Sequence, residues 1–450
     1  MASVKQRIWG WYFFDWASQP YNTLLLTFIF GPYFATVVGD PTRAQELWGL
    51  GLAVAGFFIA VSAPILGAIA DTAGRRMPWI WFFSALYVVG AWALWWAEPG
   101  MEQVGWILVA FAIGMIGMEF ATIFTNALLP SLVPSTETGR VSGSGFAFGY
   151  WGGVLSLALM LLFLAENETG RTLIGLAPAF GLDPEMREGT RSVGPFTAIW
   201  YVVFMIPFFL WVKEPRTIAA SRARLSLRAA LRDLWTSLRG LVHRPSLAAY
   251  LGSSMFYRDA LNGIYGFGGI YAVGVLGWSI IQIGVFGVVG AITAAIFSWL
   301  GGLADRRYGP KPVITVCVLI LIGVCALIVG MSRQSLFGMP LPAGSSLPDI
   351  LFYIAGGAIG GAGGALQAAS RTMMVHHTNP ERPTEAFGLY ALSGKVTSFL
   401  APGLIALFTN LTGSQQWGVA PLIGLFLIGL GLLAFVNPDG ERRLWSAKPA

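Results

Sequence analysis

Long apolar runs constrain this chain more than any other feature. Hydrophobic residues make up 55% of the 450 residues and charged residues only 11%, and the mean hydropathy is +0.66. A soluble domain usually carries roughly 25% charged residues, so this chain has too few to cover a water-facing surface. A membrane-spanning helix needs about 20 mostly apolar residues. The sequence therefore predicts an all-α, multi-pass membrane protein with twelve spans. They are residues 9–38, 46–70, 78–97, 104–130, 141–165, 195–213, 246–275, 278–303, 311–331, 349–375, 385–410 and 418–436.

A short polar loop occurs twice between these apolar runs. The first copy reads Gly67-Ala-Ile-Ala-Asp71-Thr-Ala-Gly74-Arg75-Arg76 and the second reads Gly301-Gly-Leu-Ala-Asp305-Arg306-Arg307-Tyr308-Gly309-Pro-Lys311. The two copies lie about half the chain length apart, after the second and the eighth predicted span. A repeat at that distance predicts two similar halves of six helices each, with pseudo-symmetry between them.

The predicted domains follow from this repeat. We expect an N-terminal six-helix half (1–213), a cytoplasmic basic linker (214–245), a C-terminal six-helix half (246–436) and a cytoplasmic tail (437–450). Arginines alternate with leucines in the linker, which predicts an amphipathic helix on the membrane surface. A nucleic-acid or calmodulin-like role is the alternative for such cations, but we expect no nucleic-acid partner.

The charge distribution predicts the orientation. The net charge is +6, and most Lys and Arg fall in loops on one side of the predicted topology. Because such loops usually face the cytoplasm, both termini are expected to be cytoplasmic. The expected location is a plasma or inner membrane. The only cysteines, Cys317 and Cys325, share one apolar run and indicate neither a disulfide framework nor a metal site. We expect no cofactor, and we expect a monomer.

Ionisable side chains inside the predicted spans are the candidate binding residues. A charge at the bilayer centre costs several kcal/mol, so it usually faces a cavity and serves function. Amide side chains share helical faces with these charges and extend them into polar stripes. The alternative is a set of paired charges that only holds the bundle together. The candidates for substrate or ion binding are Asp15, Gln19, Asn22, Glu119, Asn126, Arg258, Asp259, Asn262, Gln367, Arg371 and Lys395.

Different roles are expected within this set. Burial favours the neutral form of a carboxyl group, and Glu119 has no basic neighbour in the sequence, so it is the candidate proton-sensitive acid. Arg371 and Lys395 suit a substrate carboxylate or phosphate, which Arg can bind through two parallel hydrogen bonds. A proton is the expected coupling ion, while sodium coupling and uniport stay open.

The two loops are the candidate gate. Glycines let helix ends and turns approach closely, an aspartate favours the positive N-terminal end of a helix, and the arginines are expected to find carboxylates nearby. The expected gating residues are Gly67, Asp71, Gly74, Arg75 and Arg76 in the first loop and Gly301, Asp305, Arg306 and Arg307 in the second.

Three further stretches carry a family resemblance. They are Phe14-Asp15-Trp-Ala-Ser-Gln-Pro-Tyr21; Asn126-Ala-Leu-Leu-Pro130 with Ser142-Gly-Ser-Gly145-Phe-Ala-Phe-Gly149; and Gly363-Gly-Ala-Leu-Gln367-Ala-Ala-Ser370-Arg371-Thr372 with Phe387-Gly388-Leu-Tyr390-Ala-Leu-Ser393-Gly394-Lys395. The paired loops resemble the signature of the major facilitator superfamily, and these stretches resemble its vacuole-effluxer-like branch, which includes the autophagy-related amino-acid exporter. The resemblance implies a major facilitator fold and a secondary transporter that works by alternating access around a central site.

The function expected from the residues and the resemblance is transport of a small zwitterionic or anionic solute, with an amino acid or short peptide favoured and proton coupling expected. An exporter of drug-like or lipid-like organic molecules is the alternative. A channel or a non-transporting receptor on the same fold also stays open. We expect no enzyme, because the sequence contains no HExxH motif and its histidines lie in or near predicted cytoplasmic loops.

Overall fold

The computed structural model describes residues 2–167, 169–214, 239–278 and 280–440, together with 232, 235 and 236. Most of the predicted linker, and the tail after residue 440, lie outside these described residues. The chain divides into two compact units. Unit 1 contains Met1–Leu132 and Phe148–Ser226, and unit 2 contains Val133–Ala147 and Leu227–Ala450. The predicted division into domains 1–213 and 246–436 stays a prediction.

Unit 1 is built from the helices before residue 212 except for η3 and the first part of α7. Its elements are α1 (Val4–Pro20), the π-helix η1 (Tyr21–Phe28), α2 (Phe30–Val38), α3 (Pro41–Ala73), α4 (Met77–Ala93) with η2 (Leu94–Trp96), α5 (Gly105–Asn126), α6 (Leu129–Leu132), the C-terminal part of α7 (Thr138–Leu159) with η4 (Met160–Leu164), η5 (Ala179–Gly181), α8 (Glu188–Arg191) and α9 (Val193–Trp211).

The first predicted span is broken. Pro20 lacks the amide that would continue the α-helical ladder, and the helix widens into η1 directly after it. The chain then bends by 45° before α2. A proline and a π-helical stretch are two recognised causes of such a bend.

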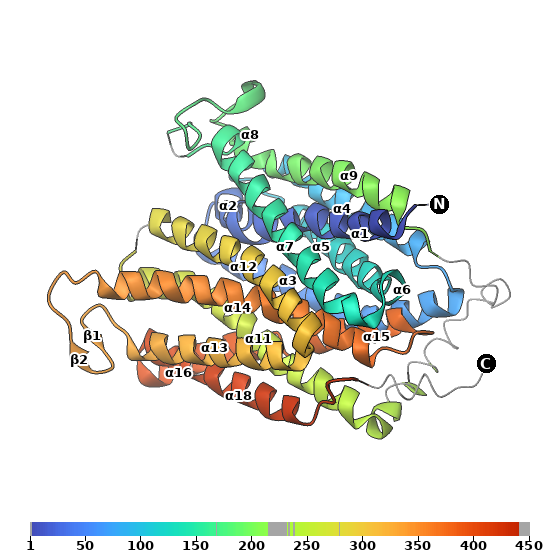
Figure 1. The fold of residues 1–450 in the computed structure, drawn as a ribbon. Coiled ribbons are helices and arrows are strands. Elements are labelled where there is room, and N and C mark those ends of the chain that lie inside the picture. The colour runs from blue at the N-terminus through green and yellow to red at the C-terminus, as the bar shows by residue number, and fades with distance from the viewer. Residues whose placement is uncertain are drawn as a thin grey trace, which may run out of the picture. The chain divides into compact units, whose positions relative to one another are not determined.

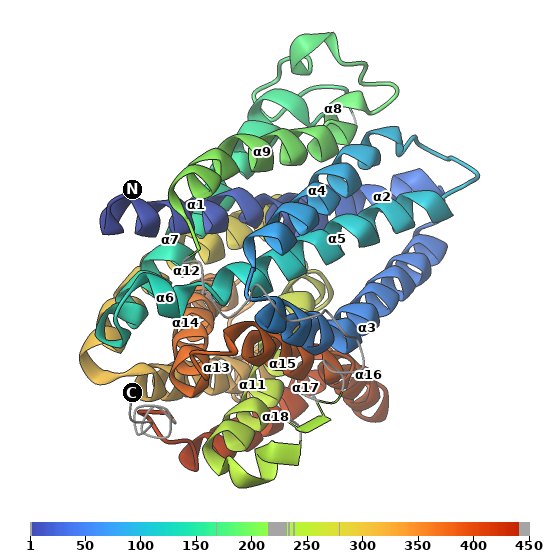
Figure 2. The ribbon, with the colours of Figure 1, turned by 90° about the vertical axis from the view of Figure 1, so that its right-hand side faces the viewer.

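Glycines set the packing distance between α4 and α5, which lie side by side (Figure 2). A Cβ atom on Gly90 would lie 2.6 Å from the Ala110 carbonyl oxygen, and one on Gly117 would lie 2.7 Å from the Phe83 carbonyl oxygen. Backbone cannot move away as a flexible side chain can. These positions therefore need glycine for the two helices to touch, which is how small residues work between membrane helices.

Unit 2 contains the remaining elements. They are η3 (Ser135–Glu137) with the N-terminal part of α7, η7 (Leu241–His243), α11 (Pro245–Gly274), α12 (Ile280–Tyr308), α13 (Pro310–Gly330), the hairpin β1 (Ser335–Leu336) and β2 (Met339–Pro340), α14 (Leu347–His377), α15 (Pro383–Val396), α16 (Leu400–Thr412), α17 (Gln415–Gly418) and α18 (Ala420–Ala434).

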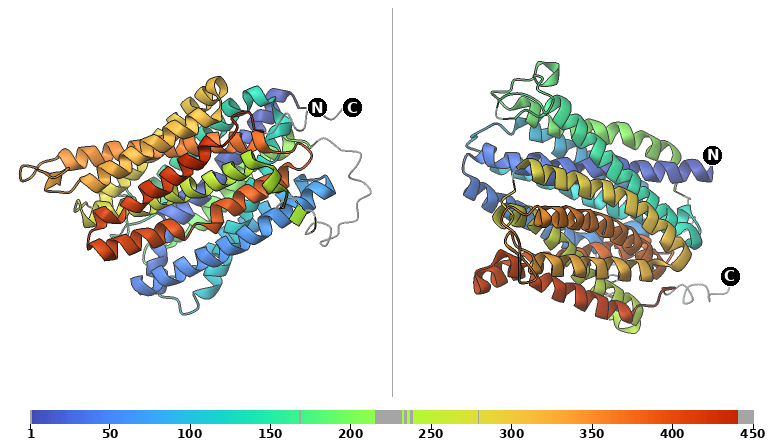
Figure 3. Two further views of the ribbon diagram at one scale, coloured as in Figure 1. Left: turned by 90° about the horizontal axis from the view of Figure 1, so that it is seen from below. Right: turned by 60° about the vertical axis from the view of Figure 1, so that its left-hand side comes forward.

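The most extensive helix packing in unit 2 is between α12 and α14, and Figure 3 shows the two helices running side by side. Glycines of α14 make this contact: a Cβ on Gly361 would meet the Phe297 ring at 3.0 Å, and one on Gly364 would lie 2.8 Å from the Ala294 carbonyl oxygen. The β1–β2 hairpin joins α13 to α14 and extends past their ends (Figure 1).

Ten helices among the described residues are long and apolar enough to cross a membrane, and the bent first pair makes up to eleven. The remaining predicted span forms as α11, a 30-residue helix. It is too polar to meet the same test because Arg258, Asp259 and Asn262 lie in its middle. The predicted span 385–410 is also interrupted, since α15 ends at Val396 and α16 begins at Leu400.

Candidate functional site

In unit 1, the polar stripe of the first span lies on α1 and the start of η1. Asp15, Gln19 and Asn22 are all partly exposed. The C-terminal part of α7 packs against this stripe through its glycines: a Cβ on Gly149 would lie 3.0 Å from the Asp15 carbonyl oxygen, and one on Gly153 would lie 3.0 Å from Gln19 Cγ. The stripe therefore borders a close helix contact, so part of its length faces protein.

Glu119 lies on α5, on the face turned away from α4. Gly117 makes the contact with α4, and two residues of an α-helix turn the chain by about 200°. Glu119 is partly exposed, as is Asn126 at the last position of the helix. On the same helix, the Thr125 carbonyl accepts from Trp11 Nε1 (3.0 Å), and this bond holds α1 beside α5. The first and fourth predicted spans are thus neighbours.

The first repeated loop contains a chain of ion pairs. Arg76 pairs with Asp71 (3.0 Å) and with Glu214 (3.1 Å), and the Asp71 side chain is only 2% exposed. The Glu214 carboxylate also accepts from the backbone amides of Arg76 (2.7 Å) and Met77 (3.3 Å). It thereby caps the N-terminus of α4, where backbone amides have no partner inside the helix.

The rest of this loop supports the turn. Gly74 has φ +63°, a conformation that favours glycine, and its amide donates to the carbonyls of Ala70 (3.0 Å) and Asp71 (3.1 Å). Gly67 is buried within α3, whereas Arg75 is exposed. The loop thus turns sharply from α3 into α4 and places Arg76 between two carboxylates.

In unit 2, Arg371 is buried and binds α7. The residue is only 3% exposed. Nε donates to Ser142 Oγ (2.9 Å), a terminal nitrogen donates to the Ser142 carbonyl (2.7 Å), and the guanidinium lies 4.2 Å from the centre of the Phe146 ring. Ser142 in turn donates to the Ala368 carbonyl of α14 (2.8 Å). These contacts join α14 to the first part of α7.

Arg258 points toward α15. Its guanidinium donates to the Tyr390 carbonyl (2.9 Å) and lies 4.1 Å from the centre of the Tyr390 ring. A Cβ on Gly394 would lie 2.6 Å from the guanidinium carbon, so glycine leaves room for the arginine. The next residue is Lys395, which is partly exposed in the last turn of α15. The structure therefore brings Arg258 to the helical turn that carries Lys395.

Asp259 caps a helix. One carboxylate oxygen, Oδ2, accepts from the Ala401 amide (2.9 Å) in the first turn of α16, and the residue is 1% exposed. The other oxygen, Oδ1, has no hydrogen-bond partner among the described residues. A carboxylate at this position stabilises the free amides and the positive end of the helix. Asp259 thus supports the break between α15 and α16.

The remaining candidates of unit 2 are less buried than Asp259 and Arg371. Gln367 is partly exposed on α14, one turn before Arg371. Asn262 is exposed on α11, one turn after Arg258. Both are therefore accessible on the helices that carry the two arginines.

The second repeated loop is arranged differently from the first. Asp305 is buried, and a Cβ on Gly139 would lie 2.5 Å from its carboxyl carbon, so the carboxylate packs on the first turn of α7. Gly301 packs against Ala365 of α14. Arg306 pairs with Glu137 (2.7 Å), which also binds Arg140 (2.7 Å). Arg307 is exposed and lies over the Tyr308 ring. The Lys311 amine donates to the carbonyls of Ala434 and Val436 at the end of α18.

Sequence reasoning missed three residues that organise these regions. Glu214 was assigned to the start of the linker, and Glu137 and Ser142 were not assigned a role. Glu214 is the acid that directly follows the last apolar run of the first half, and Glu137 lies four residues before the start of the fifth. Those positions, at the ends of spans and near basic loops, were the available signal.

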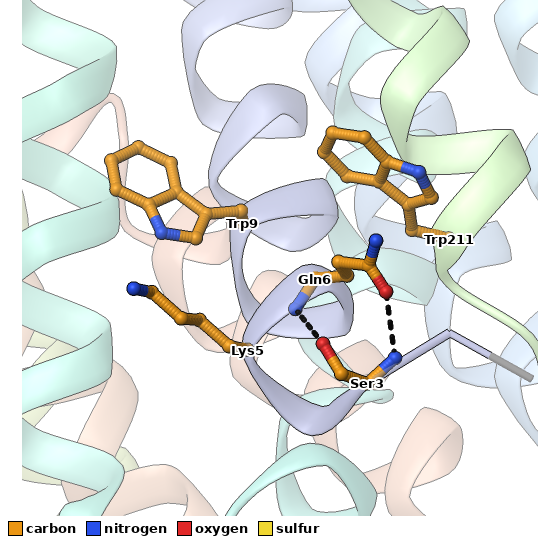
Figure 4. A pocket seen from close by; sticks show the side chains of 5 residues that line it. All are labelled: Ser3, Lys5, Gln6, Trp9 and Trp211. Atoms are coloured by element: carbon orange, nitrogen blue, oxygen red, sulfur yellow. Dashed lines mark hydrogen bonds between the residues drawn. The ribbon is translucent and has the colours of Figure 1, made fainter.

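A shallow hollow at the start of α1 does not include any candidate residue. Ser3, Lys5, Gln6, Trp9 and Trp211 line it (Figure 4). Ser3 and Gln6 exchange hydrogen bonds across the first turn, with Gln6 Oε1 accepting from the Ser3 amide (2.8 Å) and Ser3 Oγ accepting from the Gln6 amide (3.2 Å). This reciprocal pair is a capping box, which stabilises the start of α1.

Comparison with known proteins identifies the family and the fold. Residues 50–443 match the family described as "Vacuole effluxer Atg22 like". The uncharacterized MFS-type transporter YxiO of Bacillus subtilis is 26% identical over 444 residues, covering 96% of this chain and 94% of that protein. Autophagy-related protein 22 of Cryptococcus neoformans is 24% identical and covers 69% of this chain, which spans only about half (52%) of the fungal protein.

Solved structures share the fold at low sequence identity. The proton:xylose symporter XylE has a TM-score of 0.72 at 11% identity and covers 98% of this chain and 99% of its own. The transporter FucP, solved in an outward conformation, has a TM-score of 0.67 at 15% identity and covers 96% and 98%. The expected all-α major facilitator fold is therefore confirmed. This chain belongs to the vacuole effluxer Atg22-like family and has the major facilitator fold.

Proposed function

We propose that the protein carries a small zwitterionic solute, an amino acid or a short peptide, across the membrane by alternating access and with proton coupling. Carboxylates of the candidate set bind the ammonium group of the substrate, and cations of the set bind its carboxylate. The members of the candidate set that are at least partly exposed carry these roles: Asp15, Gln19, Asn22, Glu119, Asn126, Arg258, Asn262, Gln367 and Lys395.

The sign of the charges supports this proposal. Among the candidate residues, the ionisable side chains of unit 1 are acids, Asp15 and Glu119, while the partly exposed ones of unit 2 are the cations Arg258 and Lys395. A zwitterion presents both charges, so it matches both sets. The two remaining charged candidates, Asp259 and Arg371, are nearly fully buried and hold α16 and α7. We assign them to positioning rather than to direct substrate contact.

Counterflow in proteoliposomes tests the substrate class. The protein is reconstituted with an internal excess of one unlabelled amino acid, dipeptide, organic anion or drug-like cation, and entry of the labelled compound is followed with and without a pH gradient. We expect transient accumulation for zwitterions and none for compounds that carry a single charge. Accumulation of drug-like cations alone would overturn the proposal in favour of an exporter of organic molecules.

Glu119→Gln tests proton coupling. The amide cannot release a proton, so we expect the variant to lose accumulation driven by a pH gradient while it retains substrate exchange. Glu119→Asp is the matched control because it keeps an acid at the same position, and we expect it to retain part of the accumulation. Unchanged accumulation by Glu119→Gln would contradict the role of Glu119 as the proton-carrying acid.

The two repeated loops are proposed to control the cytoplasmic gate. In this proposal Asp71 and Asp305 stabilise one state of the transporter, and the arginines and glycines around them let the helix ends close and open. The ion pairs of Arg76 and the burial of Asp305 support it, since contacts at span ends that form in one state change turnover before they change affinity.

A further inference from the structure

The loop between η4 and α8 contains an apolar turn that is hydrogen-bonded to the end of a candidate membrane span. Residues 172–176 form the turn: the Gly175 amide donates to the Thr172 carbonyl and the Thr172 amide donates to the Leu176 carbonyl, both at 2.8 Å. The Leu173 amide donates to the Leu161 carbonyl (3.0 Å). Leu161 lies within the π-helical end of the span, so the turn lies at the depth of that helical end.

The side chains of this loop are apolar and exposed. Leu173 is 71% exposed, Leu176 57% and Phe180 93%, and Ile174 is also exposed. Residues 172–182 include no charged side chain. Moving a side chain of this size out of water gains about 1.5–3 kcal/mol. An apolar patch of this kind on a protein surface marks a contact with lipid or with a partner.

The surrounding surface favours lipid. Phe163 in η4 and Ile199 in α9, on the two helices that the loop connects, are exposed apolar side chains as well. Both helices are long and apolar enough to cross a membrane, and the Leu173–Leu161 hydrogen bond attaches the turn to the first of them. Backbone groups in lipid need hydrogen-bond partners within the protein. The turn supplies them, because its backbone groups bond to one another and to the span.

Arg171 completes the arrangement. Its guanidinium donates to the Gly175 carbonyl (2.8 Å) and its side chain remains exposed. An arginine can lay its alkyl stem along apolar surface while its charge stays at the polar boundary. The cation is thus bound to the apolar turn itself and is still exposed.

We infer that residues 172–182 form a lipid anchor. Leu173, Ile174, Leu176 and Phe180 insert into the interfacial region of the leaflet at this end of the spans, and Arg171 lies at the level of the phospholipid headgroups. The anchor holds the loop between α7 and α9 against the membrane and is independent of the transported substrate.

Spin labels on single cysteines test this anchor in the full-length protein. The native Cys317 and Cys325 are buried within α13, so a cysteine introduced at an exposed position is labelled selectively. Leu173→Cys and Phe180→Cys report on the anchor. Ile199→Cys is the control for lipid, and Glu185→Cys, an exposed acid of the same loop, is the control for water. Each variant is reconstituted at high lipid-to-protein ratio into vesicles of phosphatidylcholine and phosphatidylglycerol.

The measurement compares collisions of the label with oxygen, which concentrates in lipid, and with a water-soluble nickel chelate. We expect the oxygen-to-nickel ratio at 173 and 180 to match that at 199 and to exceed that at 185. Ratios at 173 and 180 that match 185 would overturn the inference by showing a water-facing loop. Low access to both reagents would also overturn it, with spin–spin coupling between labels indicating a second copy as the occupant.

Discussion

The two repeated loops share a sequence pattern and differ in how they hold their aspartate. In the first loop, Asp71 pairs with Arg76, and Glu214 balances that arginine while it caps α4. In the second loop, no cation among the described residues lies within ion-pair distance of Asp305, which instead packs on the first turn of α7. One aspartate is held by charge and the other by burial against a helix end.

The cations of the two loops show the same contrast. Arg76 binds a side chain that follows α9, whereas Lys311 binds backbone carbonyls at the end of α18. Both contacts tie the loop to the end of a helix in the same unit. A cation near the C-terminal end of a helix also interacts favourably with the helix dipole. The two copies of the pattern therefore share the place of attachment, the end of a helix, but differ in the type of contact that makes it.

The largest expected effect is at Glu214. Glu214→Ala removes one partner of Arg76 and the acceptor for two backbone amides at the start of α4. We expect a loss of about 2–3 kcal/mol in the free energy of unfolding. Thermal unfolding of the purified protein in detergent measures it. Glu214→Gln keeps one acceptor oxygen and should recover part of the loss; equal losses for both variants would show that the amide bonds contribute little.

Asp71→Asn tests whether the ion pair of the first loop matters for transport. The variant removes the charge that pairs with Arg76, so the proposed gate should release one of its states. We expect turnover to fall about tenfold, which corresponds to roughly 1.4 kcal/mol, with little change in substrate affinity. Initial rates over a range of substrate concentrations separate the two. Normal turnover with a large affinity loss would contradict a gating role for Asp71.

Asp305→Asn tests the other way of holding the aspartate. The amide is nearly isosteric, and no paired cation is left behind when the charge is removed. We expect the free energy of unfolding to fall by about 1 kcal/mol or less, the size of a charge–dipole contact at a helix end. The same thermal assay measures it. A loss as large as that of Glu214→Ala would mean that Asp305 depends on an ionic partner after all.

The smallest expected effect is at Arg306. This side chain is 50% exposed and pairs with a single carboxylate, Glu137. Exposed pairs of this kind contribute about 0.2–1 kcal/mol, so Arg306→Gln should leave the unfolding temperature nearly unchanged and should become silent at high salt. A loss that persists at high salt would point to packing rather than to charge.

Periodicity predicted the elements well because each span must satisfy its own backbone inside the membrane. The observed α5, α13 and α14 begin and end within a few residues of the predicted 104–130, 311–331 and 349–375. Hydrophobicity did not predict the breaks within the spans 9–38 and 385–410, because both are continuously apolar. Residues 385–410 read as one apolar run, but the chain turns at 397–399, where the Leu400 amide donates to the Thr397 carbonyl (2.7 Å).

The contacts of the candidate residues were harder to predict, because they depend on partners from other elements. Helical spacing placed Arg371 and Asp259 on polar faces, yet it could not show that Ser142 and the Ala401 amide would engage them. Both partners lie more than a hundred residues away in sequence. An amide or a hydroxyl carries no charge or periodicity that would single it out. Whether the remaining candidates bind substrate stays a prediction.

The cap on α16 has a consequence for how the protein is made. α11 is the most polar of the long helices and emerges from the ribosome well before α16, whose Ala401 amide meets Asp259 from 142 residues further along the chain. Until then, the Asp259 carboxylate lacks this donor. Charged residues in a helix make its insertion into the membrane unfavourable. Stable insertion of α11 thus depends on a later segment, so truncation before residue 401 is expected to leave α11 outside the bilayer or retained at the translocon.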